Sequence, residues 1–153
     1  MNKKLEDFVW AKNKLPVVLD ILQRVGFFFY WIFDNIQILA TIKFLSADPS
    51  FHAKLGALFW FLGGLFAIAR LIYDLVEELF KKPQEKNDKI ITKICIDLIG
   101  RFGDLIVAAN GCGLMLIIGK PLNDGVLGIC GLIASLISLY NLIPTPIAPN
   151  TSK

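Results

Sequence analysis

Apolar residues dominate four long stretches of the chain, and short polar joints separate these stretches. The last stretch, 126–143, contains no charged side chain. At about 1.5 Å per residue, a helix over this stretch just reaches the length needed to cross the hydrocarbon core of a bilayer, roughly 30 Å. The other stretches are 17–39, 55–76 and 94–118. This pattern predicts an all-α fold: a small helical integral membrane protein with about four apolar or amphipathic helices.

Small residues form a stripe along the last predicted helix. Their spacings of three and four residues place them on one face, and such a stripe allows helices in lipid to approach closely. A helix in a soluble core would be expected to carry Leu or Val at these positions. We therefore predict helix–helix packing, including self-association, at Gly128, Gly131, Ser135 and Ser138.

The first apolar stretch follows Pro16, a residue that is tolerated at the start of a helix. Its first two turns are polar on one face and apolar on the other, whereas every face is apolar after Gly26. Such a helix either lies in the membrane interface or enters the bilayer from Gly26 onward, and the pattern leaves both arrangements open. The candidate residues for interfacial insertion are Val18, Leu22, Val25 and Phe29.

Charged residues in the second and third stretches have helical spacing. Arg70 and Asp74 are four residues apart, and Arg101 lies between Asp97 and Asp104 at spacings of four and three. Ion pairs at these spacings lower the cost of placing charge near lipid. An ion pair at the membrane interface accounts for Arg70, and a role in conduction or transport is the alternative.

A short basic stretch precedes the third apolar segment. Its lysines share one helix face, opposite a face of isoleucine and leucine. It is expected to contact an anionic membrane surface or an import receptor, or to be an ordinary solvated helix face. The lysines concerned are Lys86, Lys89 and Lys93.

Composition supports the membrane assignment, because 55% of the 153 residues are hydrophobic, 19% are charged and the mean hydropathy is +0.59. The net charge of +3 is too small and too dispersed to indicate nucleic-acid binding. Cys95, Cys112 and Cys130 lie in apolar stretches without CxxC spacing, so we expect them to be small buried residues in a reducing compartment. The lysines near Met1 are followed by acids, which is not the pattern of a signal peptide.

The sequence offers no arrangement typical of catalysis. The lone histidine, His52, has no second ligand for a metal nearby, and the acids lie in polar joints or beside an Arg or Lys. No glycine-rich phosphate loop follows a strand. We predict that the protein is not an enzyme and binds neither a cofactor nor a metal.

Four blocks of sequence, 26–35, 55–60, 99–105 and 124–140, follow a recognisable order. The first is an aromatic run closed by Asp-Asn, the third ends in Asp-Leu, and the last is a glycine-rich apolar helix that opens with Asp-Gly. In this order they resemble the peroxin-11 family of peroxisomal membrane-shaping proteins. The residues that carry the family-like motifs are Tyr30, Asp34, Asn35, Asp104, Asp124 and Gly125.

The resemblance implies an integral protein of the peroxisomal membrane, or of a related organelle such as the glycosome. Such a protein would elongate the membrane and promote peroxisome proliferation and fission through amphipathic insertion and self-association. The implied partners are membrane lipids, further copies in a homo-oligomer, the import receptor for peroxisomal membrane proteins and the fission machinery. The family precedent places both termini in the cytosol, which requires an even number of membrane crossings.

The front of the chain departs from the family pattern. Family members carry a longer N-terminal region with an amphipathic helix, whereas only about 25 residues precede the aromatic block here. We divide the chain into a polar lead-in (1–16), a peroxin-11-like membrane helical domain (17–143) and a proline-rich tail (144–153).

Two other functions fit the same sequence. One is a small pore or solute carrier of the organelle membrane, with charged residues of the second and third stretches facing an aqueous path. The other is a membrane adaptor that recruits division machinery. The number and orientation of the membrane spans stay open at this stage, because lysines occur in almost every joint.

Overall fold

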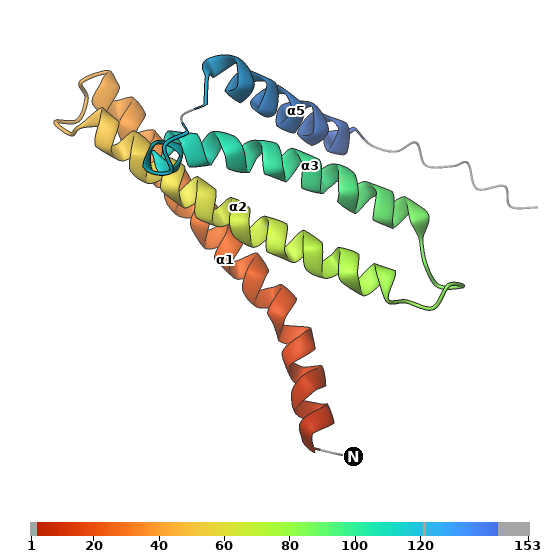
Figure 1. Cartoon of the computed structure of the whole chain (residues 1–153). Coiled ribbons are helices and arrows are strands. Elements are labelled where there is room, and N and C mark those ends of the chain that lie inside the picture. The colour runs from red at the N-terminus through yellow and green to blue at the C-terminus, as the bar shows by residue number, and fades with distance from the viewer. Residues whose placement is uncertain (1–2, 121, 144–153) are drawn as a thin grey trace, which may run out of the picture.

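The computed structural model describes residues 3–120 and 122–143, with the side chains of 14–120 and 122–143. Within these residues the chain forms four long helices, a one-turn helix and no strand (Figure 1). The all-α prediction is therefore confirmed, whereas the tail 144–153 lies outside the described residues. The helices are α1 (Lys3–Thr41), α2 (Pro49–Leu79), α3 (Asp88–Gly111), α4 (Leu114–Ile117) and α5 (Asp124–Leu142).

Two helix boundaries differ from the prediction. Helix α1 begins at Lys3 and runs through Pro16, so the expectation that this proline starts the helix was wrong. Proline removes one backbone N–H donor, and the apolar stretch that follows it supplies the packing that keeps the helix continuous. The third apolar stretch ends early, because Gly113 takes a left-handed φ of +84° and separates α3 from α4.

Side-chain caps determine where three of the helices begin. Asp48 accepts a hydrogen bond from the Ser50 N–H at 2.9 Å, just before α2. Asn87 accepts from the backbone of the first turn of α3, and Asn123 accepts from the Val126 N–H at 2.9 Å in α5. Each cap satisfies backbone donors that have no partner inside the helix.

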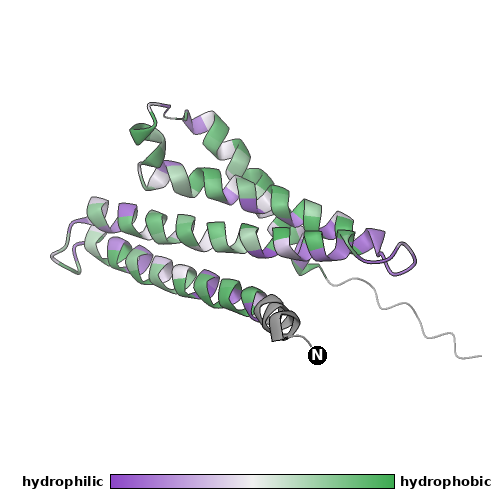
Figure 2. Ribbon diagram, turned by 60° about the horizontal axis from the view of Figure 1, so that its bottom comes forward, coloured by the Kyte–Doolittle hydropathy of each residue, from purple (hydrophilic) through white to green (hydrophobic). Residues whose placement is uncertain are grey.

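The long helices form a row in which each helix packs on its neighbours in chain order. In the described part of the chain, α1 contacts α2, α2 contacts α3, and α3 contacts α5 (Figure 1). The first turns of α1 leave the other helices and end in open space. The buried residues are few and mostly small, whereas many large apolar side chains are exposed. Figure 2 shows that hydrophobic residues predominate along the long helices. An apolar exterior of this extent is expected of a protein whose solvent is lipid.

Glycines allow close approach at the helix contacts. A Cβ atom on Gly26 of α1 would lie 2.8 Å from the Cα of Gly63 in α2. A Cβ atom on Gly103 of α3 would lie 2.7 Å from the carbonyl oxygen of Cys130 in α5. In lipid, where burial of apolar surface does not drive association between helices, close backbone packing is a main source of stability.

Three of these helices are long and apolar enough to cross a membrane, judged by length and composition within the described residues. They are Lys14–Thr41 of α1, Pro49–Leu79 of α2 and Asp124–Leu142 of α5. The predicted span at 55–76 falls inside the second of them, and the predicted span at 126–143 extends one residue beyond the third. Helix α3 carries too much charge to be one of the three.

Candidate functional site

The residues expected to insert at the membrane interface lie on α1. Val18, Leu22 and Val25 are exposed. Phe29 is 37% exposed, and its ring stacks beside Phe59 of α2 with centroids 5.0 Å apart. Three of the four candidates therefore present an apolar surface that the described helices leave uncovered.

The small-residue stripe of α5 faces mostly outward. A Cβ atom on Gly128 would meet nothing within 4 Å, and Ser135 and Ser138 are exposed. Gly131 approaches α3, where a Cβ would lie 3.9 Å from a methyl group of Val107, and Ser138 borders the polar cavity that α3 also lines. Within the chain, the contact with α3 is made by neighbouring positions of α5 instead.

That contact involves Cys130, Ala134 and Ile137 of α5, facing Gly100 and Gly103 of α3. Sequence reasoning missed this pairing, although two glycines three residues apart in α3 were the available signal. The predicted role of the α5 stripe in self-association stays a prediction.

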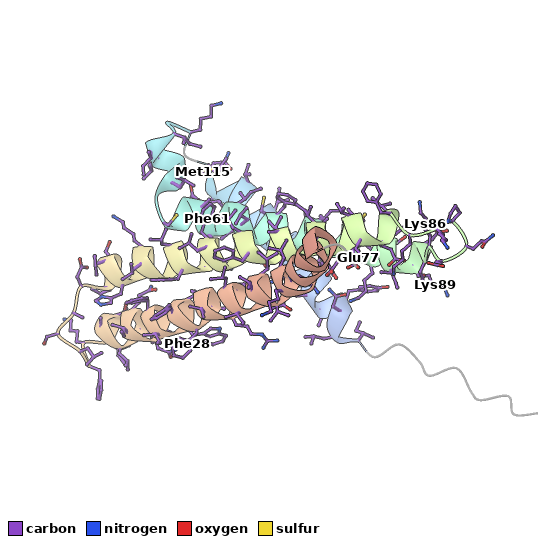
Figure 3. The ribbon with its side chains drawn as sticks, turned by 90° about the horizontal axis from the view of Figure 1, so that it is seen from below. Phe28, Phe61, Glu77, Lys86, Lys89 and Met115 are labelled. Carbon is purple, nitrogen blue, oxygen red and sulfur yellow. The ribbon has the colours of Figure 1, made fainter. Side chains whose placement is uncertain are left out.

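The basic residues lie around the α2–α3 loop. Lys86 is in the loop, Lys89 is in the first turn of α3, and both are exposed (Figure 3). The Lys93 ammonium lies 3.7 Å from a carboxylate oxygen of Asp97, one turn further along α3. These lysines form a positively charged rim at one end of the row.

Glu78 fixes this loop, a role that the sequence pattern did not reveal. Its side chain is buried, and its carboxylate accepts a hydrogen bond from the Asn87 N–H at 3.0 Å. The other carboxylate oxygen binds the ammonium of Lys81. This hydrogen bond raises the pKa of Lys81 above its ordinary value.

The family-like aromatic run joins α1 to α2. Tyr30 stacks on Trp60 with centroids 5.4 Å apart, and Phe33 stacks on Phe59 at 5.5 Å. Offset aromatic pairs of this kind add to the stability of helix contacts. The side chain of Asn35 donates to the backbone carbonyl of its own helix one turn earlier. Asp34, beside it, is half-buried.

The remaining family-like residues lie at two places. Asp124 and Gly125 form the first turn of α5, where an acid is favourable near the helix N-terminus. Asp104 is half-buried in α3 and faces a cavity that side chains of all four long helices line.

This polar cavity has a volume of about 280 Å³, and its lining residues from α2 and α3 lie in the half of α2 nearer the α2–α3 loop and around the middle of α3. Helices α1, α2, α3 and α5 all contribute to its lining, with an excess of acids over cations. Its charged residues are Asp20, Arg70, Asp74, Asp97, Arg101 and Asp104.

The predicted pairing of Arg70 with Asp74 is confirmed. Arg70 also pairs with Asp20 of α1, with Nε and the carboxylate oxygen 3.5 Å apart. Sequence spacing could not find Asp20, because periodicity shows which residues share a face but not which helices meet.

The second expected arrangement was right only in part. Arg101 pairs with Asp104, at 3.8 Å between a guanidinium nitrogen and a carboxylate oxygen. The Asp97 carboxylate instead accepts a hydrogen bond from the side chain of Asn141 in α5, at 2.7 Å, and faces Lys93. The charges of the cavity are thus partnered within α2 and α3 and across the α1–α2 and α3–α5 contacts, which offsets part of their desolvation cost.

Among the described residues, no three His, Cys, Asp or Glu side chains gather in a way that could hold a metal ion. His52 lies near the start of α2, where its Nδ1 is 2.8 Å from the Asp48 carbonyl oxygen. The site consists of a lipid-facing apolar surface, a basic rim and a polar cavity whose charged side chains pair with one another or with a polar neighbour.

Comparison with known proteins gives these features a context. The chain matches the family described as Peroxisomal biogenesis factor 11 (PEX11) over residues 2–143. It is 28% identical to peroxisomal membrane protein PMP30A of Candida boidinii, over 80% of this chain and 59% of the relative. It is 25% identical to the peroxisomal membrane protein 11 homolog of Dictyostelium discoideum, over 83% of this chain and 62% of the relative.

The chain spans about six tenths of the length of the curated relatives it matches. No solved structure matches it significantly. The expected location is confirmed by these relatives and by helices apolar enough to span a bilayer. The chain belongs to the peroxisomal biogenesis factor 11 family and is a protein of the peroxisomal membrane.

Proposed function

We propose that the protein elongates the peroxisomal membrane and promotes peroxisome proliferation and fission. The observation that carries this proposal is the uncovered apolar surface of α1 around Val18, Leu22 and Val25. Family membership supplies the biological setting. An apolar helix face inserted at the level of the lipid headgroups expands one leaflet relative to the other and so favours curvature.

The length of α1 supports the same proposal. Its 39 residues extend about 58 Å at 1.5 Å per residue, nearly twice the thickness of a hydrocarbon core. Unless the whole helix tilts strongly, its part beyond the hydrocarbon core must therefore lie in the interface or extend into water. The first turns of α1, which leave the other helices, have the freedom to do so.

Self-association is the second element of the proposed mechanism. Gly128 and Ser135 lie on the exposed side of α5, where a helix of another copy has room to pack, whereas Ser138 borders the polar cavity. Lateral packing of copies concentrates the inserted helices in one region of membrane. Lys86, Lys89 and Lys93 remain the candidates for contact with acidic lipids or an import receptor, and recruitment of fission machinery rests on family membership alone.

The test is expression of the fluorescently tagged chain beside a peroxisomal matrix marker, with the length and number of organelles scored. We expect longer and more numerous peroxisomes with the wild-type chain. The combined substitution V18S, L22S and V25S should shorten them again while the protein still reaches the organelle. The matched control V18L with V25L keeps the apolar surface and should behave as the wild type.

Equal elongation by the serine variant would show that this surface does not act by insertion. Unchanged peroxisomes with the wild-type chain would show that the chain does not remodel membranes by itself.

Crosslinking in membranes tests self-association separately. Gly128→Leu should reduce the yield of crosslinked dimers, because leucine fills the space that a second helix needs without touching α3. Ile129→Leu, at the exposed neighbouring position, should leave the yield unchanged. Gly131→Leu should also reduce it, although this residue lies closer to Val107 of α3. Undiminished crosslinking of Gly128→Leu would remove the α5 stripe from the mechanism.

The polar cavity favours a second candidate function, a small pore or solute carrier. Intramembrane charges often mark a solute path, and here they gather from three helices, α1, α2 and α3. Two observations make it the weaker candidate. The charges already pair with one another, and α1 and α2 pack through aromatic rings beyond the cavity, toward the α1–α2 loop.

Conductance across liposomes containing the purified chain distinguishes the two functions. A pore lined by the cavity should lose conductance in Arg101→Gln, while Lys54→Gln, at the opposite end of the row, should not change it. Absence of conductance in the wild type would exclude a pore.

A further inference from the structure

Helix α3 is unlike the three candidate spans. It carries six charged residues, three of which lie in its first two turns, and composition alone would leave it outside the bilayer. Its position in the row leads to a different conclusion. Helix α3 lies between α2 and α5 and is the helix that both of them contact.

The contacts fix the direction of α3. On the α2 side, Gly64 faces Leu105 and Ala57 faces Gly111. Lower residue numbers in α2 thus meet higher numbers in α3, which makes these two helices antiparallel. The contacts cover about 9–10 Å of both helices at 1.5 Å per residue.

The same holds on the α5 side. Gly100 faces Ile137, Gly103 faces Cys130 and Ala134, and Val107 lies beside Gly131. Helix α3 therefore lies alongside both α2 and α5 and is antiparallel to each of them.

The register also fixes the depth of α3. Gly63 and Gly64 lie at the middle of the candidate span of α2, and the middle of α5 is near Ala134. Both places contact α3 between Gly103 and Leu105. If α2 and α5 cross the bilayer, the middle of α3 lies at the same depth as theirs.

We propose that α3 is a fourth membrane-crossing helix, sheltered between α2 and α5. The lysine-rich α2–α3 loop then lies on the same side of the membrane as the N-terminal end of α1 and the C-terminal end of α5. The α1–α2 loop and the α3–α5 joint lie on the opposite side. This arrangement goes beyond the proposed function and does not depend on membrane remodelling.

The charges of α3 are compatible with a crossing. Lys93 lies about 16 Å from the level of Asp104 along the helix, at the depth of the headgroups. The deeper charges, Asp97, Arg101 and Asp104, face the polar cavity and pair there. The part of α3 after Asp104 carries no charge, and its buried residues include Ala108 and Ala109.

The distribution of lysines gives the orientation. The α2–α3 loop and the first turns of α3 carry Lys81, Lys82, Lys86, Lys89 and Lys93, whereas the opposite end of the row carries Lys43, Lys54 and Lys120. Because short segments rich in lysine stay on the cytoplasmic side, the α2–α3 loop faces the cytosol. The unequal distribution of lysines indicates an orientation only when four crossings place each joint on a definite side of the membrane.

Single cysteines test the arrangement in isolated peroxisomes. The three native cysteines are replaced by alanine in the full chain, and Glu85→Cys, Ala47→Cys and Lys120→Cys are introduced one at a time. A membrane-impermeant maleimide is applied to intact and to permeabilised organelles. We expect Glu85→Cys to be labelled in intact organelles, and the other two only after permeabilisation.

Labelling of Lys120→Cys together with Glu85→Cys in intact organelles would mean that α3 does not cross, and would overturn the proposal. Protection of Glu85→Cys with labelling of the other two would overturn the cytosolic orientation. Lys82→Cys and Leu122→Cys replace the first and third sites if either of those variants fails to insert, which resistance to alkaline extraction reports.

Discussion

The close contact of α3 with α5 can be tested by adding a single methyl group. An alanine Cβ at position 103 would lie 2.7 Å from the Cys130 carbonyl oxygen and 3.4 Å from the Ala134 Cβ. The obstructing atom belongs to the backbone, so no side-chain rotation can relieve the clash. An ordinary contact begins near 3.4 Å, so the helices must separate locally by at least about 0.7 Å.

The expected energy follows from two opposing effects. Overpacking of this kind costs about 1–3 kcal/mol. Alanine in a helix interior regains up to about 1 kcal/mol relative to glycine. Gly128→Ala, in α5, gains the same propensity with nothing within 4 Å of the new atom. Helix propensity contributes equally to both variants. The difference between their free energies of unfolding is therefore the steric cost of Gly103→Ala, about 1–3 kcal/mol.

The measurement is unfolding of the purified chain in mixed micelles by titration with sodium dodecyl sulfate, followed by circular dichroism. Gly103→Ala should unfold at a lower detergent fraction than Gly128→Ala, and Gly103→Val at a lower fraction still. If the alanine variants at 103 and 128 unfold together, the backbones of α3 and α5 are not in the close contact described here.

Three further substitutions probe other parts of the row. Gly113→Ala should cost about 1 kcal/mol in the same titration, because only the left-handed backbone and no neighbour opposes it; an unchanged midpoint would contradict this reasoning. Asn141→Leu removes a hydrogen bond to Asp97 and should cost about 1–2 kcal/mol, and equal stability would show that the bond is not formed in micelles. Glu78→Ala should speed tryptic cleavage in the α2–α3 loop, whereas Glu78→Gln, which retains an acceptor for the Asn87 N–H, should be cleaved more slowly than the alanine variant.

Apolar length and periodicity were sufficient to predict the helices, since a bilayer demands long apolar segments and few other structures satisfy the backbone there. The break after α3 lies in a run that contains Gly111 and Gly113, and glycine lowers the stability of a helix interior. The continuation of α1 through Pro16 was not predictable from local rules, because proline is compatible with a helix start as well as with a tolerated interior position.

Contacts within one helix were easier to predict than contacts between helices. The Arg70–Asp74 pair follows from a spacing of four. Asn141 and Asp97 are 44 residues apart, and nothing in either segment specifies the other as its partner. For the same reason, the stripe of small residues on α5 was readable in the sequence, but the α5 face that meets α3 was not.

The packing of each helix only on its neighbours in chain order also bears on how the protein assembles. No contact between the described long helices has to wait for a segment beyond the next long helix, so each hairpin can form as soon as its second helix has entered the membrane. Local pairing of this kind is associated with fast folding, and stability in such arrays is approximately a sum over adjacent pairs. A lesion at the α3–α5 contact should thus release α5 while the α1–α2 hairpin, held by Gly26, Gly63 and the aromatic pairs, stays assembled.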